Sequence, residues 1–239
     1  MPENHAKSAF ILGLFIFLGL SVLGWFLGSQ LIEFKKLERS VTVKGLSERE
    51  YPADIALWPI QFVAATNNLT ELYSTLESNT VEIVGFLERN GIHSDEITVA
   101  SPVVTDKLAQ SYGDNSRIEF RYSATQTVTV YSPKVDTVRA VIRRLVELGK
   151  KGIAFSGGDY HSTTEYIFTR LNDVKPEMIE EATTKAREVA QKFAQDSSSR
   201  LGKIRRASQG QFTIEDRDRN TPYVKKVRVV STVEYYLSD

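Results

Sequence analysis

The most extended hydrophobic pattern in the chain is a run near its N-terminus. Between Lys7 and Glu33 there are 25 residues without an ionisable side chain. A helix rising about 1.5 Å per residue needs about 20 residues to cross the roughly 30 Å hydrocarbon core of a bilayer. The run therefore predicts one transmembrane helix over residues 9–32, after an N-terminal tail (1–8) and before a juxtamembrane linker (33–39).

A cleaved secretory signal is the alternative interpretation of this run. Such a signal has an apolar core of about 7 to 15 residues, followed by a small-x-small cleavage site. Here the apolar core extends from Ala9 to Leu27, and the best small-x-small candidate, Gly19-Leu20-Ser21, lies inside it. The pattern favours an uncleaved signal-anchor, and cleavage stays open as the second possibility.

A strict alternation of apolar and polar residues follows much later in the chain. From Ile118 to Val130 every even position is apolar except Gln126, and every odd position is polar or charged. Period two indicates a strand with one buried and one solvated face, which is typical of antiparallel sheets. We therefore expect a long strand over residues 117–131.

Two other segments have the helical period of 3.6 residues. In the first, apolar residues recur three and four apart between a capping box, Asn68 with Glu71, and a stop signal at Gly91. In the second, residues 132–149, a Ser-Pro pair opens the pattern and a glycine ends it. Both segments are predicted to be amphipathic helices.

A third and longer helix is predicted from Pro176 to Leu201-Gly202. Its distinctive feature is an alanine at every fourth position, beside larger apolar residues: Ala182, Ala186, Ala190 and Ala194. Four-residue spacing places these small side chains along one face of the helix. Such a stripe allows the helix to lie unusually close to whatever packs on it.

The order of these elements predicts an α+β fold with antiparallel sheets. Strands are expected near residues 40–49, 53–65, 96–109, 117–131, 153–169, 204–215 and 224–237. The middle six elements give the order β-α-β-β-α-β, the split βαβ arrangement with two helices on one face of a sheet. The first strand, the long helix and the C-terminal hairpin would form a second layered lobe. No linker rich in Gly, Ser or Pro separates the lobes, so we expect one interlocked domain over residues 40–239.

Two stretches of the chain carry a family resemblance. Residues 41–49, VTVKGLSER, followed by 52–56, PADIA, resemble the opening of the SIMPL-domain family, in which a strand and a Gly-rich turn lead to a second strand. Residues 181–202 are similar to the alanine-rich helix of that family, which ends in Leu-Gly. The chain departs from the family pattern at Ser47, where a second glycine is usual, and at Ala53, which separates the proline from the aspartate.

The resemblance carries expectations about function. It implies a mainly bacterial and usually exported envelope protein. Members of the family have been linked to oxidative-stress tolerance, to assembly into large ring-like or channel-like oligomers and, in animals, to binding a kinase in an inflammatory pathway. No catalytic residues are established for the family, so the resemblance supplies none here.

The residues themselves point to no catalytic, cofactor-binding or metal-binding site. The chain has no cysteine, and its three histidines, His5, His93 and His161, lack the paired spacing of zinc or copper ligands. The Gly-rich segment 156–161 lacks the lysine and the following helix of a phosphate loop, so a bulge or hairpin turn is the better interpretation. We therefore predict no enzyme activity. The alternative is a hydrolase or small-molecule-binding enzyme that uses this loop, with Asp159 beside His161.

Charge and hydropathy define the expected partners. Of the 30 basic and 30 acidic side chains of the chain, only Lys7 and Glu3 lie within the first 32 residues. The rest of the chain therefore has 29 of each. No global field attracts nucleic acid, and we expect none to bind. The expected partners are the membrane, through the single N-terminal helix, further copies in a homo-oligomer, and an unknown protein. Exposed strand edges and the alanine-striped helix are the candidate contact surfaces.

The expected location is the inner (cytoplasmic) membrane, with one membrane crossing and the soluble domain in the periplasm. This placement comes from the apolar run and the family resemblance. The basic residues that flank the run, Lys7, Lys35, Lys36 and Arg39, do not decide the orientation, because long domains translocate largely regardless of such bias.

Overall fold

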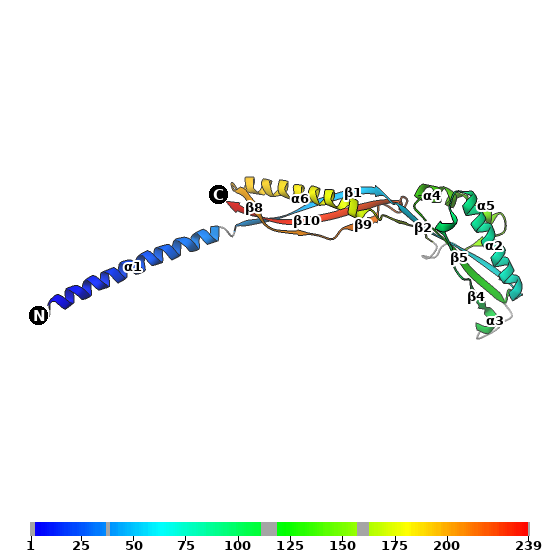
Figure 1. Cartoon of the computed structure of the whole chain (residues 1–239), viewed down its shortest axis with the longest axis horizontal. Coiled ribbons are helices and arrows are strands. Elements are labelled where there is room, and N and C mark those ends of the chain that lie inside the picture. The colour runs from blue at the N-terminus through cyan, green and yellow to red at the C-terminus, as the bar shows by residue number, and fades with distance from the viewer. Residues whose placement is uncertain (1–2, 37–38, 111–118, 157–162, 239) are drawn as a thin grey trace. The chain divides into compact units, whose positions relative to one another are not determined.

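The structure of the chain is a computed structural model, which describes residues 3–36, 39–110, 119–156 and 163–238 (Figure 1). An N-terminal helix, α1 (Glu3–Lys36), precedes the folded part of the chain. The chain divides into two compact units. Unit 1 consists of Met1–Glu48, Lys175–Thr213 and Arg228–Asp239, and unit 2 consists of Arg49–Val174 and Ile214–Val227.

Helix α1 runs through the apolar segment without a break. Its large apolar side chains that are described are all exposed, from 47% at Leu14 to 80% at Trp25. Among the described residues, no helix combines the length and the apolar character needed to cross a bilayer.

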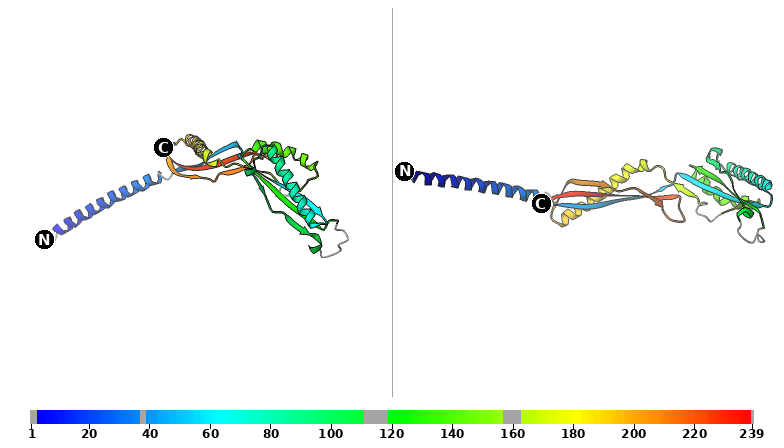
Figure 2. Two further views of the ribbon diagram at one scale, coloured as in Figure 1. Left: turned by 45° about the vertical axis from the view of Figure 1, so that its right-hand side comes forward. Right: turned by 90° about the horizontal axis from the view of Figure 1, so that it is seen from below.

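Unit 2 has the predicted order of strands and helices. Its elements are β2 (Ile55–Thr66), α2 (Leu69–Arg89), η1 (Ser94–Glu96), β3 (Ile97–Val99), β4 (Val103–Asp106), α3 (Lys107–Gln110), β5 (Tyr122–Ser132), α4 (Val135–Arg144), α5 (Val146–Gly149), β6 (Ala154–Phe155) and β7 (Glu165–Ile167). The strand order is β3-β5-β2-β6, with β4 also on β5 and β7 also on β2. All of these pairs are antiparallel. The helices α2 and α4 cover one face of this sheet (Figure 2), which confirms the split βαβ prediction.

The core of unit 2 follows the predicted alternation. From Ala124 onward the even-numbered residues of β5 are buried and the odd-numbered ones are more exposed. They pack with even-numbered residues of β2 against the apolar face of α2: Trp58, Ile60, Phe62, Leu72, Leu76, Ile83, Leu87, Val128 and Val130. The alternating pattern therefore identified the inward face of β5 correctly, because side chains of a strand alternate between its two faces.

The capping of α2 is confirmed in part. The side-chain oxygen of Asn68 accepts hydrogen bonds from Thr70 N at 2.9 Å and Glu71 N at 3.3 Å. The Glu71 carboxylate, however, accepts from the Thr66 hydroxyl at 3.0 Å and does not close the expected box. Gly91 ends the helix with φ +89°, a backbone conformation that favours glycine.

Several element boundaries in unit 2 differ from the prediction. The strand expected at 96–109 is divided into β3 and β4 around Pro102, which has no N–H to donate to a sheet. The strand expected at 153–169 is represented by the short β6 and β7, and the second helix is divided into α4 and α5 at Leu145. Strand β5 begins only at Tyr122, because residues 119–121 are described and are not strand; the expected positions 117 and 118 lie outside the described residues.

Unit 1 contains the second predicted layer. Its elements are α1, most of β1 (Ser40–Pro52), most of α6 (Leu171–Asp196), β8 (Arg200–Gln209) and the end of β10 (Val224–Ser238), and β9 (Thr213–Asp216) begins at its boundary. The strand order is β1-β10-β8, and β9 also pairs with β10. Helix α6 lies along one face of this sheet (Figure 1). The predicted lobe of first strand, long helix and C-terminal hairpin is thus confirmed.

The alanine stripe of α6 explains how this layer packs. All four of its alanines are at most 2% exposed. Ala186 and Ala190 pack in one cluster with Val43, Val233 and Tyr235 of the sheet. A Cβ added to Gly45 would lie 1.8 Å from the carbonyl oxygen of Ala182, so the helix and the strand meet backbone to backbone. The predicted close packing is correct. The alanine face is used inside unit 1, so the prediction of a contact surface on this helix is left to its other faces.

Both ends of α6 differ from the prediction. The helix begins at Leu171 and includes Pro176 near its start, where the proline removes only one intrahelical hydrogen bond. It ends at Asp196, where Ser198 takes φ +54° and Ser199 N donates to Ala194 O at 2.8 Å. Gly202, the expected stop, lies instead in β8, where an added Cβ would be 3.0 Å from Tyr236 O.

Candidate functional site

Strand β8 is a largely exposed edge of the unit 1 sheet. It is the last strand on its side of the sheet, and only Leu201 among its ten residues is half-buried while the rest are exposed. Ile204, a large apolar residue, is 49% exposed. In the part of the chain that the structure describes, no strand pairs with the outer edge of β8. Such an edge presents backbone groups that can pair with another polypeptide.

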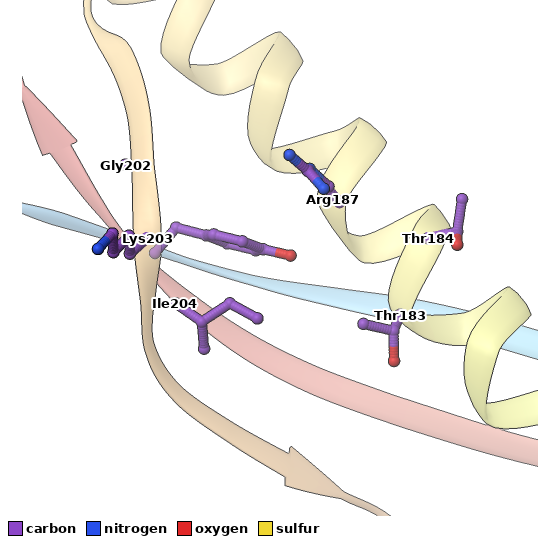
Figure 3. Close-up of a pocket in the computed structure, with 7 residues that line it drawn as sticks. Thr183, Thr184, Arg187, Gly202, Lys203 and Ile204 are labelled. Atoms are coloured by element: carbon purple, nitrogen blue, oxygen red, sulfur yellow. The ribbon is translucent and has the colours of Figure 1, made fainter.

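A groove of about 440 Å³ lies between β8 and α6 (Figure 3). Ile204 and Tyr235, which are partners in the β8–β10 register, line it from the sheet. Thr183, Thr184 and Arg187 line it from α6. Figure 3 shows Ile204 on the side of β8 that faces α6, whereas the side chain of Lys203 points to the other side. The groove exists because α6 packs over β1 and β10 and leaves β8 uncovered.

Strand β8 is strongly basic. Arg205 donates a hydrogen bond to Glu234 on β10 at 2.9 Å, and Ser40 on β1 donates to the same carboxylate at 2.6 Å. The hydrogen bond from Ser40 is the main cause that lowers the pKa of Glu234, and nearby Arg205 adds to it. Within the described residues, Lys203 and Arg206 form no ion pair. The exposed strand therefore keeps an excess of positive charge.

The Gly-rich loop of the alternative enzyme hypothesis lies mostly outside the described residues. These omitted residues are 157–162, and they include Asp159 and His161. Ser156, just before them, donates through its side chain to the Gln61 side chain at 2.7 Å and through its backbone to the Gln61 carbonyl at 3.0 Å. These hydrogen bonds hold the start of the loop on β2.

His93 has a structural position in the described part of the chain. It lies in the turn after α2, and its backbone N–H donates to the Glu96 carboxylate at 2.7 Å. Glu96 is buried and also accepts from the Ser132 hydroxyl at 3.0 Å. No group of three or more metal-ligating side chains occurs among the described residues. The prediction of no metal-binding residue stays a prediction, because the described residues do not include His161.

The groove beside β8 was not identified from the sequence. The residues that form it come from three separate segments, and its existence depends on which strand lies at the edge of the sheet. One signal was present, an isoleucine within the basic run Lys203-Ile204-Arg205-Arg206. A single apolar residue among charges is ordinary on protein surfaces, so this signal alone defined no site.

Together, the two units define an α+β protein with a split βαβ sheet and a second, helix-backed sheet. The family model SIMPL, described as a protein of unknown function (DUF541), matches residues 41–234 and so includes both units. The chain therefore belongs to the SIMPL family, as the resemblance in residues 41–49 and 181–202 indicated. No curated protein matches the chain at significant similarity.

Proposed function

We propose that this chain is a membrane-tethered envelope protein that acts through protein contacts, in the first place with other copies of itself, and that it catalyses no reaction. The observation that carries the proposal is the exposed edge of β8 with its adjoining groove. The tether and the association are separate claims and have separate tests.

The tether rests on the chemistry of α1. Its sequence from Ser8 to Ile32 has no ionisable side chain, and its described apolar side chains are exposed all round the helix. A helix that is apolar on every side is stable when protein or lipid covers it. Lipid is the covering that fits a run of this length. We place the soluble domain in the periplasm because the SIMPL resemblance implies an exported protein.

The tether predicts firm membrane association of the full chain in bacterial cells. Alkaline carbonate is expected to leave it in the membrane fraction, and protease added to spheroplasts is expected to digest the domain. Replacing Phe17 and Leu18 together with Arg costs about 5–7 kcal/mol at the centre of a membrane helix and is expected to release much of the protein. Val146→Arg, at an exposed position in α5, is the control. Extraction of the unaltered chain by carbonate contradicts the tether, and protection from protease contradicts the periplasmic placement.

The association rests on the geometry of the sheet in unit 1. β8 is antiparallel to β10. The hydrogen bonds Leu237 N to Arg39 O and Ala53 N to Tyr223 O show that β1 is antiparallel to β10 as well. The two outer strands, β1 and β8, therefore run parallel to each other. Copies held in one membrane by the same N-terminal helix share one orientation, so β1 of one copy can pair with β8 of the next.

Charge supports β1 as the strand that meets β8. Basic residues on an edge strand hinder pairing with another basic strand. The four charged residues of β1 balance, because Lys44 and Arg49 are matched by Glu48 and Glu50. Two β8 strands would repel each other, whereas the charges of β1 cancel, and its Glu48 and Glu50 form ion pairs with Arg228 and Arg217 of the same chain. We therefore propose head-to-tail contact between the two different edges.

The association predicts an oligomer of the full chain in detergent. Light scattering is expected to give a protein mass above that of one chain. Ile204→Lys is expected to weaken self-association at least tenfold, about 1.4 kcal/mol, because it puts a charge at the groove. Val146→Lys, an exposed apolar residue on α5 of unit 2, is the matched control and is expected to change nothing. A strictly monomeric chain, or equal masses for Ile204→Lys and the unaltered chain, contradicts self-association.

An oxidative-stress role of the kind implied by the SIMPL resemblance is proposed only as an indirect one. The chain has no cysteine, and its sulfur atoms belong to Met1 and Met178. Met178 is fully buried in α6. Oxidation of methionine requires access of the oxidant to the sulfur, so this chain offers little redox chemistry of its own.

A further inference from the structure

Unit 2 contains a cavity that the proposed function does not use. It has a volume of about 510 Å³ and lies between two segments of the chain. One wall is formed by residues 163–166, which include the start of β7. The other is formed by the hairpin from β9 to β10, through Asp216, Arg219, Pro222 and Lys225. The volume is within the range of small-molecule sites in proteins.

The charges of this cavity are only partly compensated inside the protein. Lys225 is a buried residue, and its ammonium forms an ion pair with Asp216. Glu165 on β7 and Arg219 on the hairpin also line the cavity, and neither forms an ion pair with any described residue. Apart from the pair of Lys225 with Asp216, the charged groups of the lining are the Glu165 carboxylate on one wall and the Arg219 guanidinium on the other. These two groups can bind a ligand.

The uncharged part of the lining gives the cavity an apolar surface. Tyr166 and Pro222 supply it, one from each wall. Burial raises the pKa of Tyr166, so its hydroxyl remains protonated and adds no charge. Thr163 and Thr164 add hydrogen-bonding groups at the end of the same wall. The cavity thus combines opposite charges with a small apolar surface.

The walls are held in place by contacts within unit 2. Tyr166 packs edge-on against Tyr223 at 6.1 Å, and the Arg139 guanidinium of α4 lies 3.4 Å from the centre of the Tyr223 ring. In the hairpin, Asp218 accepts hydrogen bonds from the backbone N–H groups of Asn220 and Thr221, each at 2.8 Å. The hydroxyl of Thr221 and the guanidinium of Arg217 also donate to Asp218 and lower its pKa to about 2. A wall fixed in this way loses little freedom when a ligand binds.

We propose that this cavity binds a small ligand that has both an ammonium and a carboxylate group, such as a free amino acid or a short peptide. Glu165 binds the ammonium, Arg219 binds the carboxylate, and Tyr166 with Pro222 contacts the apolar part between them. Arginine suits a carboxylate because its planar fork donates two parallel hydrogen bonds. The site lies in unit 2 and is independent of the β8 edge in unit 1.

The test is calorimetric titration of the full chain in detergent with alanine and with the dipeptide alanyl-alanine. The N-acetyl and C-amide derivatives of the dipeptide, each lacking one charge, are titrated in parallel. The dipeptide is expected to bind, and each derivative is expected to bind at least tenfold more weakly, because each loses a charge-assisted hydrogen bond. Binding by alanine as well assigns a free amino acid, whereas binding by the dipeptide alone assigns a peptide.

Two substitutions in the cavity distinguish binding at this site from non-specific binding elsewhere on the surface. Glu165→Gln and Arg219→Gln remove one charge each at exposed positions and are each expected to weaken dipeptide binding about tenfold or more. Glu188→Gln on α6 and Arg143→Gln on α4 remove the same charges elsewhere and are expected to leave binding unchanged. The proposal is overturned if neither alanine nor the dipeptide binds, if the derivatives bind as well as the dipeptide, or if the cavity exchanges have no effect. Ile204→Lys leaves this binding intact, so the two proposals fail independently.

Discussion

Gly45→Ala is expected to disrupt unit 1, with a loss of about 3 kcal/mol or more of unfolding free energy. The new Cβ would lie 1.8 Å from Ala182 O and 2.5 Å from Ala186 N, both of them helix backbone atoms. Backbone atoms cannot rotate out of the way as a side chain does, so α6 must move away from β1. Overpacking of a tight core costs about 1–3 kcal/mol and sometimes more. Denaturant unfolding of the full chain in detergent measures this loss.

Gly149→Ala is the matched control, because nothing lies within 4 Å of a Cβ added there. It is expected to change stability by no more than about 1 kcal/mol. Amide hydrogen exchange adds a second measurement. In Gly45→Ala, exchange should accelerate in α6 and β1 and stay unchanged in α2 and β2, because those elements belong to unit 2. Equal stability of the two variants would contradict backbone contact between β1 and α6.

Phe62→Ala is expected to destabilise unit 2 by about 3–5 kcal/mol. Phe62 lies on β2 between β5 and β6, is fully buried, and belongs to the main hydrophobic core. Removing a buried aromatic ring loses its transfer free energy and leaves a cavity that the surroundings fill only in part. The loss is large compared with the total stability of a typical domain, about 5–15 kcal/mol. Here hydrogen exchange should accelerate in β2, β5 and α2.

Val63→Ala tests the same strand from its other face. Val63 follows Phe62 directly but is half-buried, because it points to the face of the sheet opposite to α2. The expected cost is about 1 kcal/mol, in proportion to the smaller apolar area removed. The prediction for unit 2 fails if Phe62→Ala and Val63→Ala lower the free energy of unfolding equally, since the sheet would then have no single buried face.

The sequence predicted most of the fold because its local signals are independent of distant contacts. The alternation in β5 gave the correct buried face, and Asn68 and Gly91 marked the two ends of α2. The ends of α6 were less predictable. The rules that place proline at a helix start and glycine at its end are preferences, and here Pro176 lies inside the helix while Ser198 takes the positive φ.

The contact surfaces were predicted less well, because they depend on which elements become neighbours. The alanine stripe was correctly interpreted as a close-packing face, yet only the position of Gly45 beside Ala182 shows that β1 occupies it. In the same way, the charges of Glu165 and Arg219 come from distant parts of the chain and gave no local pattern. The sequence suggested instead a candidate site at the Gly-rich loop 156–161. Its described residue, Ser156, donates a hydrogen bond to Gln61.

The sequence by itself determined the SIMPL family, the α+β class, the split βαβ order and the buried faces, because periodicity and capping act within a few residues of the chain. The tertiary structure alone decided that β8 is an uncovered edge, that the alanine face of α6 is buried, and that a carboxylate and a guanidinium line one cavity. The physical reason is that edges and cavities are produced by pairing between residues far apart in the chain. No local pattern specifies which strand is left without a neighbour.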